Sequence, residues 1–253
     1  MSVEYGDPLT DAHARNYAVR DYKTYLKTVR KRKPNTVNIA LAGIDHFYRF
    51  LQMEAAQVKR EDLPMLAPKA LAPDEQQRLL RAIERCNSVR DKAVTRLLFY
   101  TGLRVGECTA LNLDDVLLSA RKGIVIIRSG KGDRYREVPL NAEVQDTLKN
   151  WLKDRHERFL ETENPAFFLN RQGIRLSTRA IDLIIRKFGK DTGLALSAHI
   201  LRHTCLTNLV RKGHDLVLVA EIAGHRRLET TRRYSLPTEE DRAAAMESLS
   251  IEY

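Results

Sequence analysis

The stretch Gly-Ile-Val-Ile-Ile-Arg-Ser-Gly-Lys-Gly-Asp-Arg-Tyr-Arg-Glu-Val-Pro-Leu, residues 123–140, interrupts a chain whose other apolar patterns are those of helices. A β-branched run is followed by a glycine-rich turn and then by apolar residues at Tyr135, Val138 and Leu140. This order predicts a β-hairpin whose turn carries Lys131. We therefore expect a mainly α fold with a small β-sheet, which is the α+β class.

Helices are predicted on both sides of this hairpin. Apolar residues at helical spacing indicate helices near residues 79–83 and 94–100 before it, and over residues 181–188 and 199–211 after it. A short tail helix is expected after Pro237, where Thr238 and Asp241 resemble a capping box.

A proline-rich segment predicts two domains. Three prolines between residues 61 and 74, without helical periodicity, indicate a linker over residues 64–72. We expect residues 1–63 to form a small helical bundle and residues 73–253 to form the second domain. The apolar stripe expected on the first helix of the bundle consists of Ala14, Ala18, Tyr22, Tyr25 and Val29.

The formal net charge of +10 favours a polyanionic partner, because neutralising phosphates releases counterions. The amino-terminal bundle carries a dense part of this charge, with Asp21 as the one acid in its most basic segment. A phosphate-facing surface is one interpretation, and a solvated helix end that complements the helix dipole is the other. The basic side chains are Arg20, Lys23, Lys27, Arg30, Lys31, Arg32 and Lys33.

The sequence has no apolar run long enough to cross a bilayer, and its start does not resemble a signal peptide. We expect a cytoplasmic protein without a membrane partner. The three cysteines, Cys86, Cys108 and Cys205, are odd in number and scattered, which predicts neither a disulfide framework nor a metal site.

Two candidate catalytic cations lie at turns. Arg104 lies two residues after Gly102 at a predicted helix start, where its guanidinium and backbone N–H groups could together bind an anion. A structural ion pair between Arg104 and Glu107 is an equally good explanation for an arginine at this position. Lys131 sits between two glycines at the hairpin tip, from which it could reach into a groove, although most turn lysines are merely solvated.

Four further candidates follow in the last third of the chain. His199 and Arg202 are three residues apart on a predicted helix, so both could contact one phosphate. His225 comes directly after Gly224, and Tyr234 follows nine residues later. Taken alone, such a tyrosine would be expected to have a half-buried side chain that only packs against its neighbours.

Together, these residues in this order resemble the catalytic set of the tyrosine recombinase (phage integrase) family. The resemblance spans about residues 71–235 and is similar to the short two-domain kind, as in Xer-type resolvases and transposon recombinases. Gly106 and Cys205 depart from the residues that the family often has. The motifs that carry it are Thr-Gly-Leu-Arg-Val-Gly-Glu (101–107), Ser-Gly-Lys-Gly (129–132), His-Ile-Leu-Arg-His-Thr (199–204) and Ala-Gly-His…Thr-Thr-Arg-Arg-Tyr (223–234).

The resemblance implies a site-specific DNA recombinase that cleaves and rejoins strands through a 3′-phosphotyrosine and a Holliday junction. Double-stranded DNA with specific sites would be the partner, bound by a core-binding amino-terminal bundle. Four copies would assemble on two duplexes from free monomers. The implied catalytic residues are Arg104, Lys131, His199, Arg202, His225 and Tyr234, with Glu107 in a supporting role.

The chemistry of phosphodiester exchange suggests a role for each residue. The two arginines would clamp the phosphate and His225 would add a third donor. Tyr234 would be the nucleophile, with His199 as its proton acceptor and Lys131 as the general acid. We expect no metal, no ATP and no other cofactor. A type IB topoisomerase-like nicking-closing enzyme and a non-catalytic DNA-binding accessory protein are the alternatives.

Overall fold

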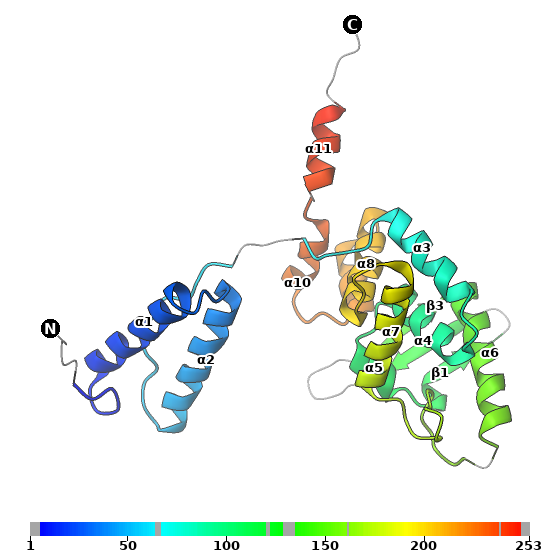
Figure 1. The fold of residues 1–253 in the computed structure, drawn as a ribbon, viewed down its shortest axis with the longest axis horizontal. Helices are drawn as coiled ribbons and strands as arrows, with labels where there is room; N and C mark the ends of the chain where they lie inside the picture. Colours follow the sequence, from blue (N-terminus) through cyan, green and yellow to red (C-terminus); the bar gives the residue numbers. More distant parts are fainter. Residues whose placement is uncertain are drawn as a thin grey trace, which may run out of the picture. The chain divides into compact units, whose positions relative to one another are not determined.

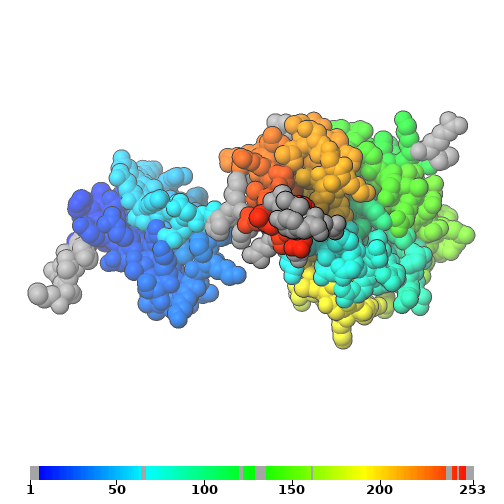
Figure 2. All heavy atoms as spheres, turned by 90° about the horizontal axis from the view of Figure 1, so that it is seen from above, coloured from blue at the N-terminus to red at the C-terminus, as the bar shows by residue number. Residues whose placement is uncertain are grey.

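The structure is a computed structural model that describes residues 6–63, 67–119, 122–128, 135–160, 162–237 and 239–248. The chain divides into two compact units, residues 1–65 and 66–253. This division lies within the linker predicted over residues 64–72. Each unit has an apolar core of its own. Figure 2 shows the surface of each unit.

The first unit is a pair of helices, α1 (Ala12–Thr28) and α2 (Pro34–Phe50). The Asp11 carboxylate caps α1 by accepting hydrogen bonds from the backbone N–H groups of His13 and Ala14. Pro34 occupies the first turn of α2, where its missing N–H costs nothing. The two helices pack through Val19, Leu26, Val37, Leu41 and Tyr48.

The stripe predicted for α1 is wrong in part. The structure buries Ala14, Val19 and Leu26, whereas Tyr22 and Tyr25 are exposed. The buried face is rotated because α1 packs on α2 through Val19 and Leu26. The aromatic side chains are therefore displayed on the surface of this unit.

The second unit is mainly helical with one small sheet, which confirms the predicted fold class (Figure 1). Among its described residues, no helix is both long and apolar enough to span a membrane. In chain order the elements are α3 (Pro73–Glu84), α4 (Val89–Thr101), α5 (Val105–Ala110), η1 (Leu113–Asp115), β1 (Val116–Leu118), β2 (Gly123–Ile127), β3 (Arg136–Leu140), α6 (Ala142–Arg158), α7 (Thr178–Thr192), α8 (Ala198–Arg211), α9 (Leu216–Ala223), α10 (Leu228–Arg232), η2 (Arg233–Ser235) and α11 (Glu239–Glu247).

The sheet is antiparallel, with the order β1-β2-β3. Val125 of β2 lies opposite Val116 of β1 and Val138 of β3. Alternate residues of β2 and β3 are buried, so one face of the sheet packs on the core. The two predicted hairpin strands are present, and β1 is an additional strand. The hairpin turn, including Lys131, lies outside the described residues.

Helix α4 is the centre of the second unit. It contacts α3, α5, α6, α7, α8 and β3, and its residues Val94, Leu97 and Leu98 are fully buried. Such a helix must be apolar around most of its circumference, because it has neighbours on all sides. The carboxyl end of α4 lies beside α8, where Cys205 Sγ contacts the carbonyl of Tyr100.

Replacing Leu98 with Ala should lower the free energy of unfolding by about 2–5 kcal/mol, because it leaves a cavity in a close-packed core. The matched control is Leu183→Ala on α7, whose side chain is 60% exposed; its effect should stay within about 0.5 kcal/mol. Urea unfolding followed by circular dichroism measures both. Equal losses in the two variants would contradict this description of the core.

Candidate active site

Two helix ends place the arginines of the site. Helix α4 ends at Gly102, whose φ of 62° is in the left-handed region that favours glycine, and the chain turns sharply there. Arg104 then becomes the residue that precedes α5. Its backbone N–H donates to Glu107 Oε2 over 2.8 Å, and its guanidinium Nη1 donates to Glu107 Oε1 over 2.8 Å. The Arg104 Nη2 group donates to the carbonyl of Gly224.

Arg202 is buried, with 4% of its surface exposed. Its Nη1 donates to the carbonyl of Gly102 over 2.5 Å, and its Nη2 donates to the carbonyl of Ala223 over 2.7 Å. These carbonyls lie at the carboxyl ends of α4 and α9, where the helix dipole favours a cation. Burial and the nearby Arg104 lower the pKa of Arg202 from its ordinary value. The helix ends therefore fix the plane of the guanidinium.

His225 follows Gly224, which ends α9 with a φ of 63°. Its Nε2 lies 3.0 Å from Arg202 Nη2, and its Nδ1 lies 2.8 Å from Thr231 Oγ1. Because a guanidinium only donates, Nε2 accepts and Nδ1 carries the proton. Burial, together with Arg202 and Arg104, lowers the pKa of His225 to about 4. The ring is therefore neutral in the DNA-free site at neutral pH.

Tyr234 lies in η2 and is 7% exposed. Its ring stacks on that of His225, with centroids 6.1 Å apart and planes inclined by 13°. Its hydroxyl lies 2.8 Å from His203 Nδ1. Burial raises the pKa of the phenol, although Arg202 and Arg233 oppose this shift. The candidate nucleophile is therefore protonated at neutral pH.

His199 has a different neighbour from the one the sequence suggested. We predicted that His199 accepts the proton of Tyr234, whereas the hydrogen bond to that hydroxyl is made by His203. The rings of His199 and His203 are in edge contact, with centroids 4.2 Å apart. His199 is thus next to the group that contacts Tyr234, one turn earlier on α8.

Arg136 also belongs to the site, although it was not among the residues predicted from the sequence. It opens β3 and is 8% exposed, and its guanidinium makes two hydrogen bonds with the Glu107 carboxylate, of 2.7 and 3.0 Å. Its Nε also donates to the carbonyl of Ile222 in α9. A Cβ at Gly224 would lie 2.7 Å from Arg136 Nη1, so any larger residue there would have to displace this guanidinium. The alternation of buried positions along β3 was the signal that could have identified Arg136.

The predicted catalytic residues are largely brought together. One connected cluster contains Arg104, Arg202, His225 and Tyr234, and Glu107 bonds to Arg104. Lys131 lies outside the described residues. The cluster combines Glu107, which is held by Arg104 and Arg136, with a third arginine, Arg202, and the neutral imidazole of His225. It can therefore bind an anion beside a buried phenol.

The predicted DNA-binding side chains of the first unit differ in their surroundings. Lys23 and Lys27 both pair with Glu61, over 2.8 and 2.9 Å, and these bonds lower the pKa of Glu61. Arg30 and Arg32 instead line a hollow of about 430 Å³ with Tyr22 and Tyr25. The remaining members of the predicted set, Arg20, Lys31 and Lys33, are exposed.

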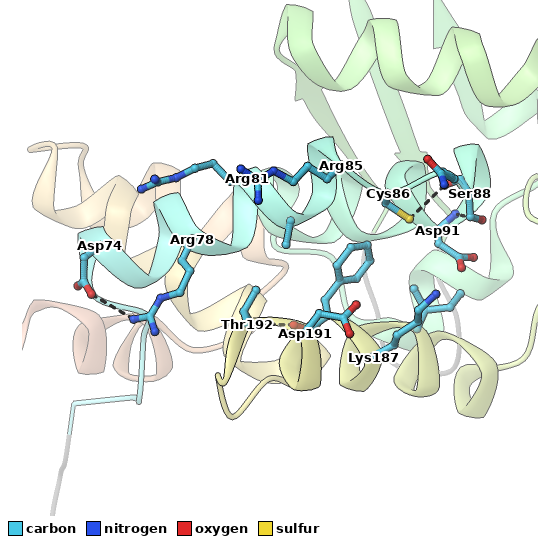
Figure 3. Close-up of a pocket in the computed structure, with 14 residues that line it drawn as sticks. Asp74, Arg78, Arg81, Arg85, Cys86, Ser88, Asp91, Lys187, Asp191 and Thr192 are labelled. Carbon is cyan, nitrogen blue, oxygen red and sulfur yellow. Dashed lines mark hydrogen bonds and ion pairs between the residues drawn. The ribbon is translucent and has the colours of Figure 1, made fainter.

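A cavity of about 940 Å³ lies between α3 and α7 (Figure 3). Arg78, Arg81 and Arg85 line it together with acidic residues such as Asp74 and Asp191. None of the described candidate catalytic residues is part of its lining. The candidate active site is therefore separate from this large cavity.

This chain is similar in sequence to known proteins. The model of the phage integrase family matches residues 69–240. The tyrosine recombinase XerC of Chromobacterium violaceum is 36% identical over 209 residues, which is 77% of this chain and 67% of that protein. The tyrosine recombinase XerA of Pyrococcus horikoshii is 28% identical over 239 residues, or 92% of this chain and 80% of that protein.

Solved structures show the same fold. XerH site-specific recombinase bound to palindromic difH substrate superposes with a TM-score of 0.75 at 26% identity, covering 92% of this chain and 69% of that one. XerA recombinase gives a TM-score of 0.62 at 27% identity, covering 94% and 84%. The chain belongs to the phage integrase family, and its enzymatic class is that of the tyrosine recombinases.

The ion pairs of Glu107 lead to a test by pH. Burial raises its pKa, but the bonds from Arg136 and Arg104 outweigh this and hold it below the ordinary 4.5. The unfolded chain therefore takes up the proton first as the pH falls, so the stability from this group is present above about pH 4.5 and is lost below it. Glu107→Gln should cost roughly 3–5 kcal/mol at pH 7.

The variant should also lose less stability than the parent protein between about pH 5 and pH 3, because its amide does not titrate. Urea unfolding at a series of pH values measures this difference. Glu137→Gln, an exposed position on the same strand, is the control and should change stability at pH 7 by at most about 0.5 kcal/mol. An unchanged acid slope in Glu107→Gln would contradict the assignment.

Proposed function

We propose that this chain is a site-specific DNA recombinase that breaks and rejoins DNA strands through a covalent 3′-phosphotyrosine on Tyr234. The observation that carries the proposal is the convergence of Arg104, Arg202 and His225 on the buried phenol. Strand exchange would proceed between two duplexes through a Holliday junction. Integration, excision and resolution all use this chemistry.

The two arginines would stabilise the charge that develops on the phosphate. The uncatalysed barrier must fall by on the order of 20 kcal/mol, and one well-placed donor supplies only about 3–4 kcal/mol. Several donors must therefore act together. Arg202 is fixed by carbonyls at two helix ends and Arg104 by Glu107, so the donors are oriented before DNA binds. His225 would contribute beside them.

The protons need an acceptor and a donor. The phenol must lose its proton as it attacks, and the departing 5′-oxygen must gain one. Lys131, which lies between β2 and β3 in the sequence, is our candidate for the donor. His199 stays in the proposed catalytic set, next to His203. The chemistry conserves the ester energy in the phosphotyrosine, so we expect no metal and no ATP requirement.

Double-stranded DNA is the proposed partner, with the first unit as a core-binding domain. The XerH structure that this chain resembles is a complex with palindromic difH substrate. The net charge of +10 and the exposed basic side chains on α1 and in the segment after it are consistent with a phosphate-binding surface. We further propose that four copies assemble on two duplexes, and that the protein acts in the cytoplasm.

The covalent step predicts a trapped intermediate. The protein is incubated without metal with nicked duplexes from its genetic neighbourhood, and it should form an adduct that resists denaturant. The short fragment between the cleavage site and the nick carries the 5′-hydroxyl. Because this fragment diffuses away, the strand cannot be rejoined. Tyr234→Phe should abolish the adduct while retaining DNA binding in gel-shift titrations. Tyr100→Phe, a partly buried tyrosine of α4 that bonds to Glu143, is the control and should retain the adduct.

Two results would overturn the proposal. If no adduct forms on any duplex that the protein binds, the non-catalytic accessory protein is favoured. If the protein relaxes supercoiled plasmids of arbitrary sequence as fast as plasmids with cognate sites, a type IB topoisomerase-like enzyme is favoured.

The contrast between paired and unpaired cations in the first unit predicts different salt dependences. Within the described residues, Arg30 and Arg32 take part in no ion pair, whereas Lys23 and Lys27 share Glu61. Replacing both arginines with Gln should weaken DNA binding and make the slope of log affinity against log salt shallower by about 2, close to 0.9 per lost phosphate contact. Replacing both lysines with Gln should change the slope less. The opposite order would contradict the proposed surface.

A further inference from the structure

The side chain that contacts the nucleophile is His203, a residue to which the catalytic motifs assign no role. It follows Arg202 on α8, and its Nδ1 lies 2.8 Å from the Tyr234 hydroxyl. Its ring and that of Tyr234 are tilted by 50°, with centroids 5.5 Å apart. A proton can therefore pass between these two groups along an existing hydrogen bond.

The other two histidines are less suitably placed for that transfer. His225 uses both ring nitrogens, one with Arg202 and one with Thr231. His199 touches the ring of His203, and the described contacts of the Tyr234 hydroxyl do not include it. Position alone therefore selects His203 among the three histidines of the site.

We propose that His203 accepts the proton of Tyr234 when the phenol attacks DNA, and returns it when the strands are rejoined. This inference rests on the proposed recombinase function. In the forward step the Tyr234 oxygen bonds to phosphorus, its proton passes to His203 Nδ1, and the bond from phosphorus to the 5′-oxygen breaks. The 5′-oxygen keeps the electron pair and takes a proton from the general acid. In the reverse step the imidazolium protonates the departing phenolate.

The charges around His203 make this transfer depend on bound DNA. Burial comes first among the causes that lower its pKa to about 4, followed by His199, Arg202, Arg233 and His225. His199 and Arg202 come from its own helix, Arg233 from η2 and His225 from the turn after α9. An anionic phosphate bound by the arginines would offset these cations and raise the proton affinity of the imidazole. Tyr234 would thus be activated only when a phosphodiester is in place.

The first test uses the unaltered protein and does not depend on whether a variant folds. If Tyr234 donates to Nδ1, the proton of the neutral His203 ring must be on Nε2. Long-range ¹H–¹⁵N correlation spectra of the DNA-free protein at pH 7 distinguish the two tautomers, with assignment from the spectrum of His203→Asn. The Nε2-protonated form is expected. A proton on Nδ1 would mean that His203 donates to the phenol, and would overturn the proposal.

The second test separates the base from the general acid. In His203→Asn an amide oxygen can take the place of Nδ1 as acceptor but cannot hold a proton at neutral pH. Single-turnover cleavage of a nicked duplex should slow by about 10²–10⁴-fold, with unchanged DNA affinity. The same assay is run on a duplex whose bridging 5′-oxygen is replaced by sulfur, which leaves without being protonated. The sulfur substrate should restore cleavage by Lys131→Ala but not by His203→Asn.

His199→Asn, one turn earlier on the same helix, is the comparison variant. Cleavage by His203→Asn at the rate of the parent protein, or its rescue by the sulfur substrate, would overturn the proposal. If His199→Asn alone cleaves slowly and the sulfur substrate does not restore its cleavage, the base is His199. If the unaltered protein forms no adduct with either duplex, the recombinase function itself fails, which is a different result from any of these.

Discussion

Glu107 lies in the protein interior between two guanidinium groups, and the geometry of the site depends on this carboxylate. Arg104 holds it from the start of α5, and Arg136 holds it from the start of β3. The same two arginines reach across to the carbonyls of Gly224 and Ile222 at the end of α9. A single buried acid thus ties a helix, a strand and the turn that carries His225. Removing one partner would leave an uncompensated buried charge, which is why these groups stabilise one another.

The remaining cation of the cluster is placed by backbone rather than by an acid. Two helices end in left-handed glycines, and Arg202 bonds to carbonyls at both ends. The cluster therefore contains three arginines and one carboxylate, and burial together with this local excess of positive charge lowers the pKa of both His203 and His225. A phosphate is the ligand that would balance this excess. The site is thus built in advance for an anion, which reduces the reorganisation needed during the reaction.

Much of this arrangement could be predicted from the sequence, because the residues concerned sit at turns or at helical spacing. The hairpin was recognisable from its β-branched run and glycines, and the helix breaks at Gly102 and Gly224 from composition. Other features depend on tertiary contacts that local patterns do not encode. The inward direction of Arg136 is set by the sheet's register, and the contact between His203 and Tyr234 joins residues 31 positions apart.

The same limit applies to the first unit. Periodicity located α1 but predicted the wrong face, since Tyr22 and Tyr25 have the spacing of buried residues and are exposed in the structure. The seven basic residues looked equivalent in the sequence. The structure distinguishes them, because Glu61 returns from beyond α2 to pair with Lys23 and Lys27.

The proposed reaction requires that Tyr234 becomes covalently joined to the 3′-phosphate of the cleaved strand. The most direct measurement is to trap the adduct on a nicked duplex, digest protein and DNA, and sequence the modified peptide by tandem mass spectrometry. We expect a nucleotide attached through phosphate to Tyr234, with a free 5′-hydroxyl on the released strand. Attachment to another side chain, or a 5′-phosphate on the released strand, would contradict it.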